Sequence, residues 1–148
     1  MSNRADASFA FTHHVRDNCL CLHVQRAARA LARRFDAALR SAGLTQGQFS
    51  LLTSLNRAEP PTIGSVANLL ALDRTTLTAN LKPLERRGLV KVAVDPHDKR
   101  SRRLILTAAG RASLAAAAPI WKREHARVER LLQTASPDVL RAGLREVS

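Results

Sequence analysis

The sequence lacks the features that mark most enzymes, secreted proteins and membrane proteins. Its 148 residues include no tyrosine and only two cysteines, and two cysteines so close together do not suggest a secreted disulfide framework. No apolar run approaches the ~20 residues of a membrane span, and the N-terminus has no signal-peptide hydrophobic region. No Ser-His-Asp set, glycine-rich phosphate loop or carboxylate pair stands out. We therefore expect a cytoplasmic protein that is not an enzyme and that carries no cofactor or metal.

Acidic residues are also scarce, and the chain is strongly basic. The formal net charge is +12, and residues 62–111 carry the largest excess, with ten basic and four acidic side chains. A charge excess concentrated in one stretch is typical of a nucleic-acid-binding surface. Alanine and leucine dominate the apolar residues, which favours helices.

The stretch from Asp73 to Arg87 is predicted to form a helix that reads DNA. Asp73 is a suitable N-cap, and Leu77, Leu81 and Leu84 recur at helical spacing and form one buried stripe. Other positions carry hydroxyls, an amide and cations, the types that reach base edges and phosphates in a major groove. These candidate DNA-binding residues are Arg74, Thr75, Thr76, Thr78, Asn80, Lys82 and Arg86. Thr76 has a second interpretation, as part of the helix start alone.

Pro83 opposes this helix, because an interior proline removes a backbone hydrogen bond and costs ~3 kcal/mol in an unstrained helix. The leucine spacing nevertheless continues to Leu84, so we keep the helix and expect a bend at Pro83. Gly88 can adopt a positive φ and is predicted to end the helix.

A β-hairpin with a cationic tip is predicted to follow the helix. Val90, Val92 and Val94 alternate on one strand, and Leu104 and Leu106 alternate on the next. Cations crowd together at the tip between them, which favours an anionic partner. The tip residues proposed to meet DNA are Asp98, Arg100 and Arg103. A major-groove helix followed by a basic hairpin indicates a winged helix-turn-helix.

Three runs of the sequence resemble the MarR family of bacterial transcription regulators. They are LLALDRTTLTANLKPLERRGLV, DPHDKRSRRLILTAAG and AARALARRFDAALRSAGLTQGQFSLL. The resemblance extends from about Asp17 to the C-terminus. It implies that Arg100 enters a minor groove and that Asp98 orients it, and that Thr75, Thr76, Thr78 and Asn80 face DNA. Arg74, Lys82 and Arg86 are better candidates for phosphate contacts. It also implies a homodimer on double-stranded DNA with a palindromic operator, joined through the terminal helices.

The expected fold class is mainly α with a small β-wing, a winged helix-turn-helix domain with N- and C-terminal dimerisation helices. Residues 1–16 are predicted to be a flexible arm and 17–44 a dimerisation helix. Residues 45–107 form the DNA-binding region, with a capping box at Thr45 to Gln48, and 108–148 form the C-terminal dimerisation helices. In this family a small aromatic or lipophilic ligand lies between the two parts. The residues expected to line its site are Arg16, Gln25, Phe49, Trp121 and His125.

Cys19 and Cys21 form a separate constellation with several interpretations. Organic-hydroperoxide sensors of the family place a reactive cysteine in a pattern similar to Leu20-Cys21-Leu22, and they use two tyrosines that this chain lacks. Phe35 and Gln46 stand at the corresponding positions. We expect the thiols to be buried and not to carry the primary signal, since burial raises a thiol pKa.

Thiol sensing, metal binding and a Cys-x-Cys oxidoreductase remain alternatives. Metal binding would add His23, yet residues at i, i+2 and i+4 do not converge on one helix face.

The predicted function is a sequence-specific DNA-binding transcription regulator, a repressor that a small-molecule ligand releases from DNA. One alternative is an oxidant-sensing repressor that acts through Cys21. The other is a non-specific architectural DNA binder, which shares the charge but needs no matched half-sites.

Overall fold

The computed structural model describes residues 8–148 and divides the chain into two compact units, up to Arg34 and from Phe35 onward. In the N-terminal unit, α1 spans Phe9–Asn18 and α2 begins at Leu20 and runs to Leu39. Ser8 caps α1 by accepting a hydrogen bond from the Phe11 backbone N–H at 3.2 Å. Cys19 has an extended backbone and separates the two helices.

The first helix corrects the prediction of a flexible arm over residues 1–16. Residues 9–16 belong to α1, and residues 1–7 lie outside the described residues. The predicted single helix from Asp17 is likewise replaced by α1, the break at Cys19 and α2. The sequence pattern missed α1 because its helix carries no buried residue, so no apolar period marks it.

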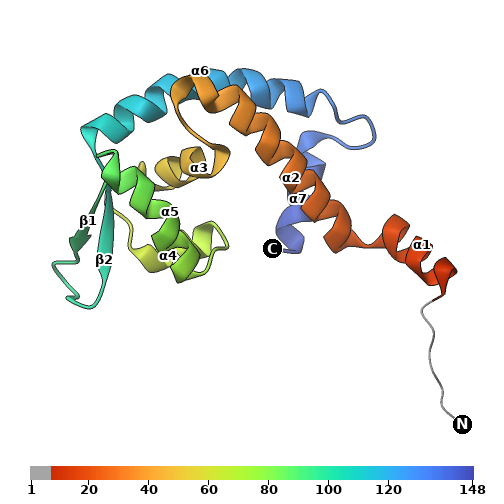
Figure 1. Ribbon diagram of the computed structural model, residues 1–148, viewed down its shortest axis with the longest axis horizontal. Coiled ribbons are helices and arrows are strands. Elements are labelled where there is room, and N and C mark those ends of the chain that lie inside the picture. Colours follow the sequence, from red (N-terminus) through yellow and green to blue (C-terminus); the bar gives the residue numbers. More distant parts are fainter. Residues whose placement is uncertain (1–7) are drawn as a thin grey trace, which may run out of the picture. The chain divides into compact units, whose positions relative to one another are not determined.

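The C-terminal unit holds the remaining elements (Figure 1). The last turn of α2 leads through the short helix η1 (Arg40–Ala42) into α3 (Gln46–Leu55), α4 (Ile63–Leu69) and α5 (Arg74–Arg86). Strands β1 (Val90–Val94) and β2 (Arg102–Leu106) form the wing, and α6 (Ala108–Glu129) and α7 (Pro137–Glu146) follow. This mainly helical fold with a small antiparallel sheet confirms the predicted fold class. No helix among residues 8–148 is long and apolar enough to cross a membrane.

Side-chain caps fix the helix starts of the C-terminal unit, including the capping box predicted at Thr45 to Gln48. Thr45 and Gln48 make the reciprocal bonds of a capping box at α3. Thr107 and Ser136 accept hydrogen bonds at the starts of α6 and α7. Gly110, in the first turn of α6, lies so close to Leu89 that a Cβ there would overlap the Leu89 carbonyl oxygen.

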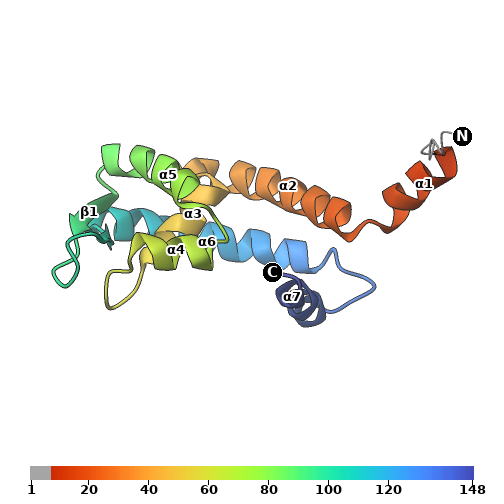
Figure 2. The ribbon, with the colours of Figure 1, turned by 90° about the horizontal axis from the view of Figure 1, so that it is seen from below.

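The core lies between α3, α5, the base of the wing and α6, and leucine supplies most of it. The largest side chains with almost no exposure are Leu39, Leu52, Val66, Leu77, Leu81, Leu84 and Leu104. β1 contacts α5 and β2 contacts α6, so the base of the wing is built into this core (Figure 2).

The two strands pair antiparallel, with Val90 opposite Leu106 and Val94 opposite Arg102. Val90 is buried, whereas Val94 at the far end is 52% exposed. The alternating valines of β1 therefore extend past the core, because Val90 packs into it and Val94 lies outside it. An isolated bridge joins Thr62 to Arg103 on the other side of β2, and the Leu104 N–H donates to the Pro61 carbonyl at 2.9 Å.

Candidate nucleic-acid interface

The start of α5 is fixed by Asp73. Its carboxylate accepts from the Thr76 backbone N–H and from the Thr76 hydroxyl, both at 2.7 Å. These bonds, chiefly that from the backbone N–H, hold the pKa of Asp73 below its ordinary value. The Thr76 hydroxyl donates to the cap, which supports its interpretation as a helix-start residue.

Three buried leucines, Leu77, Leu81 and Leu84, set the orientation of α5. With that face inward, positions 75, 79, 82 and 86 share a stripe on the opposite face. Thr75, Lys82 and Arg86 on this stripe are exposed. Ala79 lies on it as well, and no polar group in the sequence signals it. A small residue there allows close approach to a groove floor or a thymine methyl group.

Other candidate positions of α5 differ from the simple exposed face. The Thr78 hydroxyl donates to the Arg74 carbonyl at 2.8 Å and keeps its acceptor capacity. The Arg74 guanidinium lies against the first turn of α4, with a nitrogen 3.0 Å from the place of a Cβ on Gly64. Asn80 is exposed but borders a crevice of about 190 Å³ between α5 and the start of α3, beside Pro83. α5 continues through Pro83 to Arg86.

The turn between α4 and α5 contains a backbone conformation that is rare outside glycine. Ala71 has φ 51°, the only positive value among non-glycine residues of the described chain. The flanking N–H groups are bonded back to α4, since Leu70 donates to Val66 at 3.0 Å and Leu72 donates to Ala67 at 2.9 Å. The turn thus holds α5 in a fixed relation to α4.

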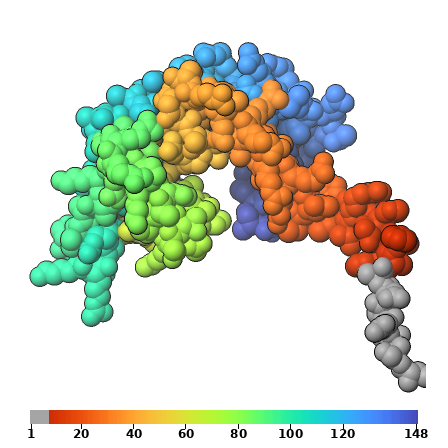
Figure 3. Space-filling model, viewed as in Figure 1, coloured from red at the N-terminus to blue at the C-terminus, as the bar shows by residue number. Residues whose placement is uncertain are grey.

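The tip of the wing presents Arg100. The Asp98 carboxylate accepts from the Arg100 backbone N–H at 2.9 Å, and the Asp98 carbonyl accepts from the Ser101 N–H at 2.9 Å. Asp98 therefore orders the turn that carries Arg100 through the backbone. Arg100 is exposed, and its guanidinium makes no hydrogen bond or ion pair to the part of the chain that the structure describes. In the space-filling view the wing projects beside α4 and α5 (Figure 3).

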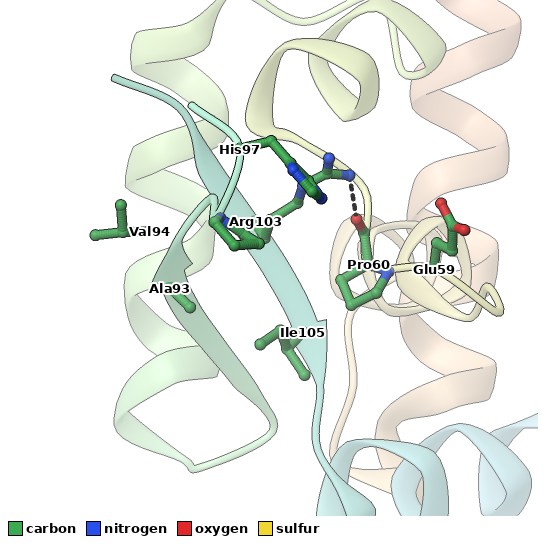
Figure 4. Close-up of a pocket in the computed structure, with 8 residues that line it drawn as sticks. Glu59, Pro60, Ala93, Val94, His97, Arg103 and Ile105 are labelled. Atoms are coloured by element: carbon green, nitrogen blue, oxygen red, sulfur yellow. Dashed lines mark hydrogen bonds between the residues drawn. The ribbon is translucent and has the colours of Figure 1, made fainter. Parts of the chain in front are cut away.

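The Arg103 side chain points toward the loop before α4 and away from the wing tip. Its Nε donates to Asp95 Oδ2 at 2.8 Å. Its Nη1 donates to the Pro60 carbonyl at 2.8 Å, the bond drawn in Figure 4. The Asp95 carboxylate also accepts from the His97 backbone N–H at 2.9 Å. That bond, followed by the Arg103 guanidinium, holds the pKa of Asp95 below its ordinary value. The sequence marked Arg103 only as one more tip cation, and it gave no sign of a partner on the distant Pro60 loop.

Three of the five predicted ligand-site residues meet in the C-terminal unit. The rings of Phe49 and Trp121 stack with centroids 6.0 Å apart, and those of Trp121 and His125 stack at 4.5 Å. Phe49 and Trp121 line a cavity of about 530 Å³. The other two belong to the N-terminal unit, where Arg16 pairs with Asp17 at 2.6 Å and the Gln25 amide reaches Cys21.

The cysteines differ from the expectation of burial. Cys21 is exposed and Cys19 is half-buried, and both are free thiols. Cys21 lies in the first turn of α2, two residues past Cys19, and its Sγ accepts from Gln25 Nε2 at 3.2 Å. The Cys19 Sγ accepts from the Leu22 backbone N–H at 3.4 Å. Over residues 8–148, no group of three His, Cys, Asp or Glu side chains is placed to hold a metal ion.

Comparison with known proteins assigns this arrangement to a family. The model of the MarR family matches residues 44–101. The transcriptional regulator MosR of Mycobacterium tuberculosis, in complex with DNA, is 37% identical with a TM-score of 0.79, covering 88% of this chain and 93% of that chain. The transcriptional repressor CouR of Rhodococcus jostii, bound to a DNA duplex, is 30% identical with a TM-score of 0.79, covering 90% and 94%.

Among curated proteins, the transcriptional activatory protein BadR of Rhodopseudomonas palustris is 32% identical over 112 residues, covering 74% of this chain and 61% of that protein. This chain spans 49% to 61% of the length of the first three curated relatives.

Proposed function

The chain belongs to the MarR family, and we propose that it is a transcription regulator that binds specific sites on double-stranded DNA. The observation that carries this proposal is a pair of exposed basic elements in one compact unit of the chain. Lys82 and Arg86 extend from α5, and Arg100 extends from the wing without an internal partner among the described residues. DNA-bound relatives of the same fold support it.

The proposed binding mode places α5 in a major groove and the wing tip in the neighbouring minor groove. Thr75, Thr78 and Asn80 are the candidates for base edges, joined by Ala79. Arg74, Lys82 and Arg86 are candidates for phosphates, and Arg100 for the minor groove. Thr76 serves the helix cap, and Arg103 acts inside the protein. We assign the chain no catalytic activity, and DNA binding agrees with a cytoplasmic location.

We propose that the active form is a homodimer on an imperfect palindrome. Helix α7 is amphipathic, and its residues Val139, Leu140 and Leu144 together with its C-cap Val147 are 41% to 69% exposed. A second copy of the chain is the partner that family membership indicates. The half-site centres are expected ~10–10.5 base pairs apart or a multiple of that spacing. Truncation before Ser136 should shift the mass measured by light scattering from that of a dimer to that of a monomer. A truncated chain that remains a dimer would reject the role of α7.

Competition between DNA molecules tests specificity. In a gel shift, the complex with the intergenic fragment beside the gene should persist in excess bulk DNA. The reason is that a specific site is bound roughly 10³–10⁷ times more tightly than non-specific DNA. An architectural DNA binder would lose the fragment to bulk DNA in proportion to its amount.

The stacked pair of Phe49 and Trp121 beside its cavity supports a site for a small aromatic or lipophilic ligand, as proposed for a repressor released by its inducer. Trp121 is the only tryptophan in the chain, so its fluorescence reports on this site alone. A panel of small phenolic carboxylates can be titrated against both Trp121 fluorescence and operator release. A compound that releases DNA without changing Trp121 fluorescence would place the inducer elsewhere.

The exposed Cys21 favours a second candidate function, an oxidant response. The thiol is free and open to a dissolved oxidant, and Gln25 contacts its sulfur at 3.2 Å. A gel shift with stoichiometric organic hydroperoxide compares wild type with Cys19→Ser/Cys21→Ser. Release of wild type alone would assign the signal to the thiols. Equal behaviour of both proteins would leave the ligand as the inducer.

A further inference from the structure

The outer part of the wing has little apolar packing to hold it in place. Val94 is 52% exposed, and residues 96–100 at the tip are all exposed. A cavity of about 340 Å³ lies between the wing and the loop that precedes α4, lined by Glu59, Pro60, Val94, His97, Arg103 and Ile105 (Figure 4). Apolar packing therefore does not fix the outer part of this hairpin, although the backbone bridge between Thr62 and Arg103 and the hydrogen bond from Leu104 to Pro61 join β2 to the loop before α4.

A polar connection spans the same place. The Arg103 side chain is 30% exposed and the Asp95 side chain 5% exposed, so their ion pair is largely shielded from water. The guanidinium donates in two directions, to Asp95 after β1 and to the Pro60 carbonyl in the loop before α4. Thr62, two residues beyond Pro60, is the N-cap of α4. Arg103 thus connects both strands of the wing to the first helix of the helix-turn-helix.

We propose that Arg103 is a positioning residue that, through Asp95 and Pro60, holds the wing against the helix-turn-helix so that Arg100 meets the minor groove while α5 occupies the major groove. This inference rests on the proposed DNA-binding function. A guanidinium suits the role because its planar fork offers several fixed donors, which a lysine ammonium lacks. Holding a contact residue in its bound position lowers the entropy lost on binding.

A direct phosphate contact is the competing role for Arg103, and charge distinguishes the two. Neutralising Asp95 makes the surface more positive, which favours DNA binding if electrostatic attraction alone matters. If Arg103 and Asp95 form a clamp, the same change loosens the wing and weakens operator binding. The two roles therefore predict opposite signs for Asp95→Asn.

Glu59→Gln is the matched control. It removes one negative charge from the same cavity wall, and the exposed Glu59 forms no hydrogen bond within residues 8–148. We expect Asp95→Asn and Arg103→Lys to weaken operator binding by roughly tenfold, and Glu59→Gln to leave it unchanged or slightly tighter. Unaltered or tighter operator binding by both Asp95→Asn and Arg103→Lys would overturn the clamp.

A double-variant cycle provides a readout that a purely structural role would not move. Arg100→Ala should weaken operator binding by roughly tenfold or more in wild type, but by less than about threefold when Asp95→Asn is already present. Hydroxyl-radical footprints should show the flanking minor groove losing protection in Asp95→Asn, while major-groove methylation protection remains. Equal effects of Arg100→Ala in both backgrounds would show that Asp95 does not position Arg100.

Folding and the proposed function are separated by two further measurements. Thermal melting identifies a variant that fails to fold. If Asp95→Asn fails to fold, the operator affinity of Arg103→Lys still tests the clamp. If wild type itself shows no preference for the intergenic fragment, the proposed function fails. If wild type binds specifically and the clamp variants match it, only the clamp fails.

Discussion

Helix α5 and the wing are both proposed to contact DNA, but they are held in place by different forces. Leu77, Leu81 and Leu84 anchor α5 with at most 2% exposure. The wing is apolar only at its base, and its outer part carries the shielded ion pair of Asp95 and Arg103, which we propose holds it in place. The free energy of apolar burial depends neither on bond direction nor on ionisation. The strength of a charged hydrogen bond depends on its geometry and on the ionisation of its partners.

The difference indicates that α5 leaves its position only when the whole unit unfolds, whereas the outer part of the wing can be displaced while the rest stays folded. The buried leucines of α5 belong to the same core as residues of β1, β2 and α6. A substitution that disturbs their packing therefore lowers the stability of the whole unit. The polar connection of the wing involves few groups and lies at its edge. Substitutions in the polar connection of the wing should therefore weaken DNA binding with little loss of stability, whereas substitutions of the buried leucines of α5 should lower both.

The largest effect is expected from Leu84→Ala. Leu84 is fully buried, and removing its side chain leaves a cavity that lowers the free energy of unfolding by ~2–5 kcal/mol. Urea unfolding measures this loss. Leu69→Ala is the control, because Leu69 lies on α4 with 59% exposure and should change stability little. Similar losses in both variants would contradict the leucine anchoring of α5.

Arg100→Ala should reverse the pattern by weakening DNA binding without altering stability. Loss of one charged contact removes roughly 1.5–3 kcal/mol of binding free energy and should reduce the salt slope of binding by about one. Lys91→Ala, an exposed position on β1 away from the tip, provides the comparison. Fluorescence anisotropy with an operator duplex measures both. Wild-type affinity in Arg100→Ala at physiological salt would reject the wing-tip contact.

Local signals allowed much of α5 to be predicted from sequence. The Asp73 cap and the leucine stripe depend on residues within one or two turns, so their chemistry is visible in a short window. The ion pair of Asp95 with Arg103 could also be suspected within the hairpin. Its extension to Pro60 could not, because the partner is a backbone carbonyl 43 residues away.

Features without a sequence pattern were missed or misread. Ala71 adopts a positive φ that only glycine or asparagine usually signals. Ala79 offers no polar group, and α1 has no buried face. Cys21 was expected to be buried from its apolar neighbours, but the short extended break at Cys19 leaves it exposed.

Asp73→Ala should have a smaller effect, since it removes a polar anchor from an element held mainly by leucines. Loss of the bonds to Thr76 frays the first turn of α5, which includes Thr75. We expect a decrease in melting temperature of roughly 2–8 °C and weaker operator binding. Asp73→Ser should restore most of both, because serine is also a good N-cap. A serine variant no better than alanine would contradict the cap as the cause.

The smallest effect is an acid-dependent change in the wing. The lowered pKa of Asp95 means that its carboxylate stabilises the folded state above the unfolded pKa of ~3.9. This contribution is lost as the pH falls through the lower folded value. His97, Arg103 and Glu59 are the other ionisable groups around the cavity. No change from Asp95 is therefore expected between pH 5 and 8.

The difference in melting temperature between wild type and Asp95→Asn tests this linkage. It should be constant above about pH 5 and should narrow as the pH falls below about 4, because the wild-type carboxyl becomes neutral like the amide. Glu59→Gln should show no such narrowing, since that carboxylate has no comparable bonds in the described chain. A difference that stays constant down to pH 3 would mean that the Asp95 charge does not hold the wing. The hydrogen-bond geometry alone would then maintain the clamp, and the contrast with the leucine-anchored α5 would lose its electrostatic basis.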